Sequence, residues 1–179
     1  MRHSTATRRE RQMMTSDKDL PRTPDDYLPF LTRYLEEEIG GVAYFAALAD
    51  RFSDPRHKEA LRLLSEIEAA VVDAVDVLRR RHRLALRDES TLRAKGAAGA
   101  ATAKYATWLA FVDHILTRFP DYIDEFAALE AIAPEADKPL LKPFTDHEIA
   151  AIRFAEREKA GDPGSLDELS AYLETSRLA

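Results

Sequence analysis

Four long segments of the chain place apolar residues at steps of three and four, the period of one face of an α-helix. They run from Pro24 to about Phe52, from Pro55 to about His82, from near Ala100 to about Leu129, and from Asp137 to Lys159. Glycine and β-branched runs are scarce, which also favours helices over strands. The pattern predicts an all-α fold, an antiparallel four-helix bundle with a short C-terminal helix from Leu166 to about Thr175.

The connections between these helices decide their order in space. Ser53-Asp54-Pro55 is so short that the first two helices must be antiparallel neighbours. The next connection, 83–99, has weak periodicity, with room for a short helix from Ser90. It is long enough to cross the whole bundle, but it also allows a simple up-down-up-down order. Pro120 interrupts the third helix, where we expect a kink or a break.

Two consecutive glycines, Gly40 and Gly41, follow a triplet of glutamates at 36–38 in the middle of the first helix. Two glycines inside a helix cost about 1–2 kcal/mol relative to alanine. We expect close approach of a neighbouring helix to offset this cost.

Polar residues interrupt the apolar faces near the middle of the helices. Glu37 and Glu68 each lie about 21–24 Å from the first turn at about 1.5 Å per residue, so they face each other across the first helix pair. His147 and Glu148 lie near the middle of the fourth helix, and His114 flanks the apolar face of the third. Facing carboxylates need a cation, a shared proton or a buried partner, so these residues predict a polar centre.

Composition narrows the classes of function. The 179 residues carry a net charge of −6, with basic and acidic residues interspersed, which argues against a nucleic-acid surface. No cysteine is present, so thiolate chemistry is excluded, and no apolar run reaches the about 20 residues of a membrane span. We expect a soluble cytoplasmic protein, with a disordered N-terminal tail at 1–22 and one helical domain at 23–179.

The order of helices with polar centres over about residues 25–160 resembles the ferritin-like superfamily of carboxylate-bridged di-iron bundles, such as ferritins, bacterioferritins and rubrerythrins. Glu37, followed by Tyr44, resembles the metal glutamate of the family's first helix and the tyrosine after it. Glu68 matches the second-helix glutamate, and His147-Glu148 falls where the fourth helix carries ligands. The resemblance implies a ferritin-like bundle that binds iron or manganese, with His114 or Glu125 as the ligand from the third helix.

The family pattern is incomplete in this chain. It requires Glu-x-x-His on two helices, because residues three apart share one face. Here Val71 follows Glu68 at three residues, and Ala151 follows Glu148. The residues also allow a structural interpretation, in which Glu68 pairs with an arginine and His147 is a hydrogen-bonded core histidine.

Two functions follow from these observations. One is a di-iron or manganese oxidoreductase that uses oxygen or peroxide, with metal ligands from the set Glu37, Glu68, His114, His147 and Glu148. The other is a non-catalytic binding or interaction module, with no assigned catalytic residue, that forms a homodimer and holds a small apolar ligand between its helices. The two broken Glu-x-x-His pairs favour the second.

Overall fold

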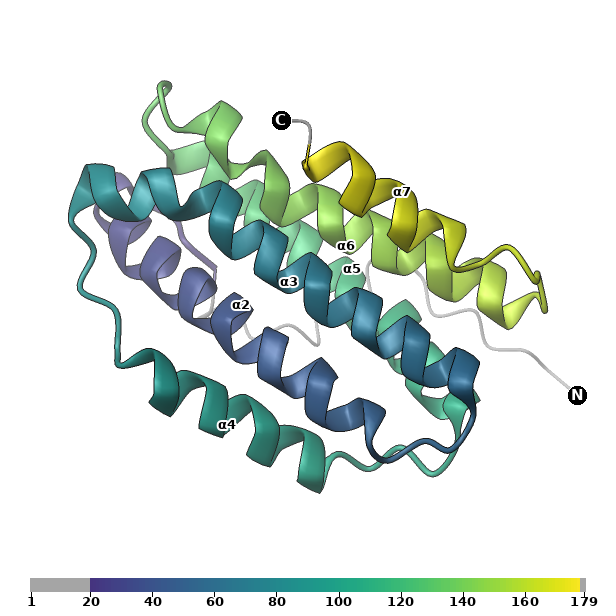
Figure 1. Ribbon diagram of the computed structural model, residues 1–179. Helices are drawn as coiled ribbons and strands as arrows, with labels where there is room; N and C mark the ends of the chain where they lie inside the picture. Colours follow the sequence, from purple (N-terminus) through teal and green to yellow (C-terminus); the bar gives the residue numbers. More distant parts are fainter. Residues whose placement is uncertain (1–19, 178–179) are drawn as a thin grey trace, which may run out of the picture.

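The computed structural model describes residues 20–177, and every regular element in that range is helical (Figure 1). A 3-10 turn, η1 (Pro24–Asp26), precedes six α-helices: α2 (Tyr27–Ala49), α3 (Pro55–His82), α4 (Glu89–Thr102), α5 (Trp108–Ile132), α6 (Lys138–Lys159) and α7 (Asp167–Ser176). The all-α prediction is therefore confirmed. The predicted disordered tail at 1–22 lies outside the described residues except for 20–22.

Most predicted helix boundaries agree with the structure within a few residues, and α3 agrees at both ends. The third long helix is the exception, because it begins at Trp108 and not near Ala100, which belongs to α4. Thr107 sets this start: its hydroxyl accepts a hydrogen bond from the backbone N–H of Ala110 at 3.1 Å. Pro120 lies inside an unbroken α5, so the predicted break is wrong.

The long helices pack as two hairpins, α2 with α3 and α5 with α6 (Figure 1). α3 also contacts α6, and α7 lies against both, whereas α2 and α5 hardly touch. Trp108 at the start of α5 stacks on His57 at the start of α3, with ring centroids 4.1 Å apart. The second and third long helices therefore run in the same direction, and the up-down-up-down order is not the one adopted.

The chain returns between these two parallel helices through α4, which lies along α2 (Figure 1). Both ends of α4 are joined to α2 by arginines. Arg87 donates to the carboxylate of Glu36 at 2.8 Å before α4 begins, and Arg51 donates to the carbonyls of Ala100 and Ala103 at 2.7 and 2.6 Å where it ends.

The middle of α4 approaches α2 through glycines, as expected from the glycine pair in the first helix. A Cβ on Gly96 would lie 2.0 Å from the carbonyl oxygen of Gly40, a separation that no side chain can occupy. The absence of a side chain on Gly96 is thus what allows α4 to approach the Gly40 carbonyl, whereas a Cβ on Gly40 would meet the carbonyl oxygen of Leu92 at an ordinary 3.5 Å.

The apolar core is divided into two clusters. One gathers around Phe45, Leu64 and Phe154, near the α2–α3 turn, and the other around Leu35, Val75 and Phe144, towards the opposite end. The residues between the clusters on α2, α3 and α6 include buried acids and a histidine. This division positions the site described below.

Replacing Gly96 with alanine is predicted to destabilise the fold. The new Cβ would force α4 away from Gly40, and overpacking of this kind costs about 1–3 kcal/mol. Urea unfolding followed by circular dichroism measures the change.

Gly99→Ala is the matched control on the same helix, because its Cβ would meet only the Tyr44 ring at an ordinary 3.6 Å. It should leave stability unchanged or raise it by up to about 1 kcal/mol through helix propensity. Equal effects of the two substitutions would contradict the close contact between α2 and α4.

Candidate metal centre

Four polar side chains lie between the two apolar clusters, and we call them the polar layer: Glu38 on α2, Glu68 on α3, and His147 and Glu148 on α6. All four are buried. A core residue lies three or four positions before each of them: Leu35 before Glu38, Leu64 before Glu68, and Phe144 before His147 and Glu148. Helical periodicity therefore turns these side chains inward.

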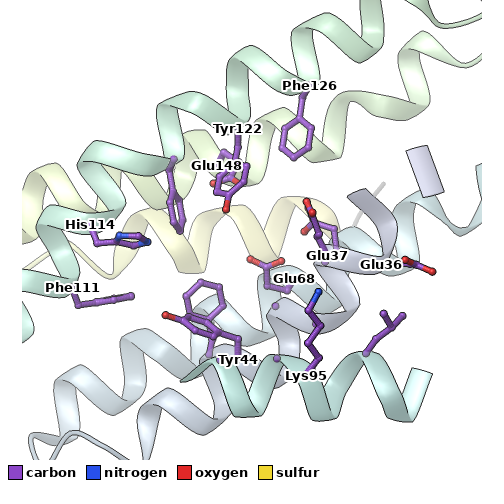
Figure 2. Close-up of a pocket in the computed structure, with 18 of the residues that line it drawn as sticks. Glu36, Glu37, Tyr44, Glu68, Lys95, Phe111, His114, Tyr122, Phe126 and Glu148 are labelled. Atoms are coloured by element: carbon purple, nitrogen blue, oxygen red, sulfur yellow. The ribbon is translucent and has the colours of Figure 1, made fainter. Parts of the chain in front are cut away.

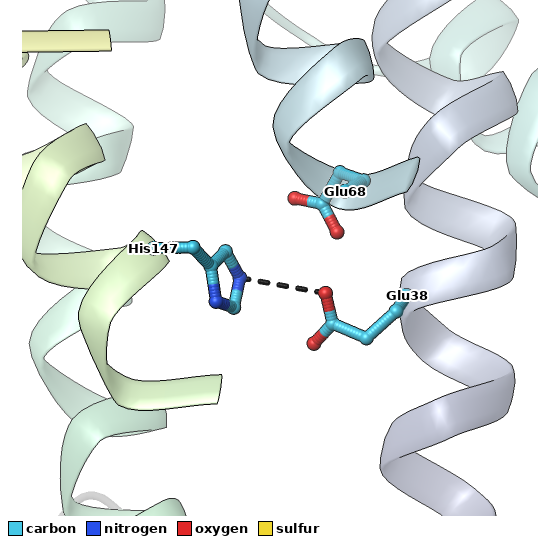
Figure 3. A group of neighbouring side chains, drawn as sticks. All are labelled: Glu38, Glu68 and His147. Carbon is cyan, nitrogen blue, oxygen red and sulfur yellow. Dashed lines mark ion pairs between the residues drawn. The ribbon is translucent and has the colours of Figure 1, made fainter. Parts of the chain in front are cut away.

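Three members of the polar layer converge on one point (Figure 3). A carboxylate oxygen from each of Glu38 and Glu68 and a ring nitrogen of His147 all lie within 4.8 Å of one another. A metal ion bonded at about 2.0–2.2 Å holds its ligand atoms no more than about 4.4 Å apart. Small movements of these side chains would therefore let them share an ion.

The imidazole of His147 is held in one orientation and one tautomer. Its Nδ1 lies 3.0 Å from the carbonyl oxygen of Pro143, one turn earlier, to which only a protonated nitrogen can donate. Nε2 then faces Glu38 Oε2 at 3.4 Å and Glu148 Oε1 at 3.5 Å. Donation from one ring nitrogen to a backbone carbonyl is how metal-bound histidines are commonly oriented.

Space for the Glu68 carboxylate depends on Gly41. A Cβ at position 41 would lie 2.7 Å from Glu68 Oε2 and 2.9 Å from its Cδ. Gly41 is thus the member of the glycine pair whose missing side chain admits the Glu68 carboxylate.

The acids of the polar layer are poorly compensated. Glu38 Oε2 and Glu148 Oε2 are buried without a hydrogen-bond partner among the described residues. Burial, reinforced by the charge of Glu68, raises the pKa of both carboxyls well above the ordinary value of 4.5. Buried carboxylate oxygens that lack donors and lie beside the Nε2 atom of an imidazole fit a divalent cation, which would supply the missing charge.

The structure brings together some of the residues expected to bind metal and separates others. Glu68 and His147 lie in the convergent group, and Glu148 adjoins it. Glu37 does not: its side chain is 52% exposed and pairs with Arg33 at 3.4 Å, whereas the Glu38 side chain is 6% exposed. One residue along a helix is a rotation of about 100°, which decides which glutamate enters the core.

Glu38 was the residue missed, although its spacing offered a signal. It follows Leu31 and Leu35 at steps of four and three and precedes Phe45 by seven, so it belongs to their face of the helix. Glu37 was selected instead by its height along the helix and by its resemblance, with Tyr44 after it, to the family's first-helix glutamate, and the height does not distinguish adjacent residues.

The third long helix contributes no member to the convergent group. Glu125 is buried but pairs with Arg33 at 2.8 Å and with Arg118 at 3.6 Å. His114 is half-buried against Tyr105, with ring centroids 5.2 Å apart, and burial followed by the charge of Arg118 lowers its pKa. Neither side chain is in the group formed by α2, α3 and α6.

A cavity of about 400 Å³ lies beside the polar layer (Figure 2). Glu37, Glu38, Glu68 and Glu148 contribute to its walls, together with His114. The Glu37 side chain points into the cavity in Figure 2. It is therefore exposed to solvent although it lies between the helices. Tyr44 also lines the cavity, but its hydroxyl donates to Tyr105 at 3.0 Å and not to a member of the polar layer.

Comparisons of the chain with known protein families, with curated proteins and with solved structures found no match. Within residues 20–177, none of the helices combines the length and the apolar character needed to cross a bilayer. The function must therefore be argued from the geometry of the polar layer and the cavity.

The raised pKa values predict how the metal-free protein responds to pH. Between 4.5 and the raised value, the folded protein binds more protons than the unfolded chain, so its stability falls as pH rises. Glu38→Gln removes one such group and should flatten the decline between about pH 5 and 8, by up to about 1.4 kcal/mol per pH unit. Urea unfolding in the presence of a chelator, repeated across this pH range, measures both slopes.

Acids with a lowered pKa, such as Asp137 beside His82 and Arg81, lose their contribution to the free energy of unfolding only at lower pH. They therefore do not change the slope of stability against pH over this range. If the native protein and Glu38→Gln have the same slope, Glu38 is not a protonated buried acid.

Proposed function

We propose that the protein is a ferritin-like helical bundle that binds a single divalent metal ion, iron or manganese, at Glu38, Glu68 and His147. The observation that carries the proposal is the convergence of these three buried ligand atoms within 4.8 Å. The parallel direction of α3 and α5, with a long crossing between them, is the helix order that a ferritin-like bundle has.

The charges around the site support a cation. Two carboxylates and a neutral imidazole nitrogen form a mixed oxygen and nitrogen ligand set, which suits manganese and ferrous iron. Glu148 adjoins this set with one unpartnered oxygen, where it can complete the ligand set or hold a proton. Each of these groups loses an unfavourable interaction when the ion binds.

The neighbouring residues support one ion and not two. Val71 and Ala151 occupy the positions where the two histidines of the family's Glu-x-x-His pattern would lie, and both are buried in the apolar clusters. Glu125 is neutralised by two arginines and is not free to bridge a second ion. The remaining open side of the site faces the cavity, to which Glu38, Glu68 and Glu148 all contribute.

Bound iron or manganese would supply redox chemistry with oxygen or peroxide as the oxidant. The chain itself orients the ligand nitrogen of His147 through Pro143 and surrounds the site with aromatic side chains that limit water. A non-catalytic binding module is the second candidate, and the apolar residues at 71 and 151 favour it. Oxidation of added Fe(II) in air, followed by absorbance, distinguishes the two.

Metal binding is tested by calorimetric titration of chelator-treated protein with Mn(II), and with Fe(II) under anaerobic conditions. We expect one equivalent to bind, and Glu38→Gln or Glu68→Gln to weaken binding at least about tenfold because each removes a charged ligand. At a concentration of about 100 times Kd, the ion should stabilise the native protein by about 2.7 kcal/mol.

Glu37→Gln is the matched control, since it makes the same chemical change one residue away. It should leave the affinity for Mn(II) within about threefold, because Glu37 lies outside the convergent group. Loss of binding in Glu37→Gln with retention in Glu38→Gln would transfer the site to Glu37. An absence of binding to the native protein would exclude the proposal.

A further inference from the structure

The cavity beside the polar layer lies between α2 and α4 on one side and α5 on the other (Figure 2). The side formed by α2 and α4 includes Tyr44, Phe45 and Leu92 and four glycines, which we call the glycine wall: Gly40, Gly41, Gly96 and Gly99. The facing wall is formed by aromatic rings of α5: Phe111, Phe119, Tyr122 and Phe126. Cavities of about 300–1,000 Å³ with mainly apolar walls and a few polar groups are typical of small-molecule sites. At about 400 Å³ this one has the size for a slender organic molecule.

The basic side chains around the cavity differ in whether a carboxylate pairs with them. Every arginine near it has a carboxylate partner: Arg33 with Glu125 at 2.8 Å, Arg87 with Glu36 at 2.6 Å, and Arg118 with Asp121 at 2.8 Å. Lys95 also lines the cavity, yet its ammonium makes no hydrogen bond or ion pair to any residue in the described part of the chain. Its charge acts on Glu36 and Glu37 without a direct ion pair, so Lys95 differs from these arginines in having no carboxylate in contact.

The position of Lys95 gives the ligand an orientation. Its side chain extends from α4 into the cavity in Figure 2, although the residue as a whole is exposed. Lys95 thus lies at the mouth, and the polar layer lies at the inner end with Glu68 and Glu148. A molecule that pairs with the ammonium would extend its body between the glycine wall and the aromatic wall.

We propose that this cavity binds a monocarboxylic acid with an apolar body, whose carboxylate pairs with Lys95 and whose far end approaches Glu38, Glu68 and His147. The pairing with Lys95 and the apolar contacts do not require the metal, so this site stands or falls separately from the proposed metal centre. The polar layer would then act on the end of the molecule most distant from its carboxylate.

Three ligands with the same body and different heads test the proposal: decanoate, decanol and decylamine, each titrated calorimetrically into the full chain. We expect decanoate to bind tightest. Lys95→Met should weaken decanoate about tenfold or more and leave decanol within about twofold, because a hydrogen-bonded charge is lost only for the acid. Lys58→Met, an exposed lysine of α3 outside the cavity, should change neither.

A second variant tests where the apolar body of the ligand lies. Gly99→Leu fills the space between the glycine wall and the Tyr44 ring and should weaken both decanoate and decanol. Circular dichroism establishes that each variant is folded. Tighter binding of decylamine, equal binding of decanoate to the native protein and Lys95→Met, or no binding of decanoate would each overturn the proposal.

The titrations are run on chelator-treated and on Mn(II)-loaded protein, which separates the two proposals. Mn(II) binding without decanoate binding contradicts the cavity ligand alone. Lys95-dependent decanoate binding without Mn(II) binding contradicts the metal centre alone.

Discussion

The burial of three acids around one imidazole is the constraint on which the rest of the structure depends. Glu38, Glu68 and Glu148 lie between two apolar clusters, where an uncompensated charge is costly. His147 donates its Nδ1–H to Pro143, so it is the Nε2 atom that faces them. A core of this size has no need of such residues for stability, since leucine or methionine would fill the same positions at no electrostatic cost. The divalent cation that we propose would compensate these acids.

Glycines of α2 and α4 meet the same constraint from two sides. Gly41 gives the Glu68 carboxylate room to enter the polar layer, and Gly96 lets α4 approach the Gly40 carbonyl closely enough to form a wall of the cavity. The cost that glycine imposes on a helix is thus accepted at the level where the polar layer and the cavity lie.

Helical periodicity in the sequence was sufficient to predict the helices and the level at which polar residues gather. It predicted the level of Glu68 and His147, which the structure brings together, but it selected Glu37 in place of Glu38, because height along a helix does not distinguish adjacent residues. The start of the third long helix was misplaced because the alanine-rich stretch before it forms helix by itself and conceals the boundary at Thr107. The sequence suggested an apolar ligand between the helices but not the position or the walls of the cavity, which result from how α4 packs and not from any local pattern.

The attachment of α4 decides how firmly each side of the cavity is held. Arg87 and Arg51 join its two ends to α2, and Gly96 brings its middle against the Gly40 carbonyl, so α4 is fastened to α2 along its whole length. On the other side, α5 is joined to α6, and it meets α2 only sparsely, at places such as the ion pair between Arg33 and Glu125. The boundary between α2 and α5 is therefore the side of the cavity with the fewest contacts to break, and α4 belongs with α2 rather than forming a separate cover.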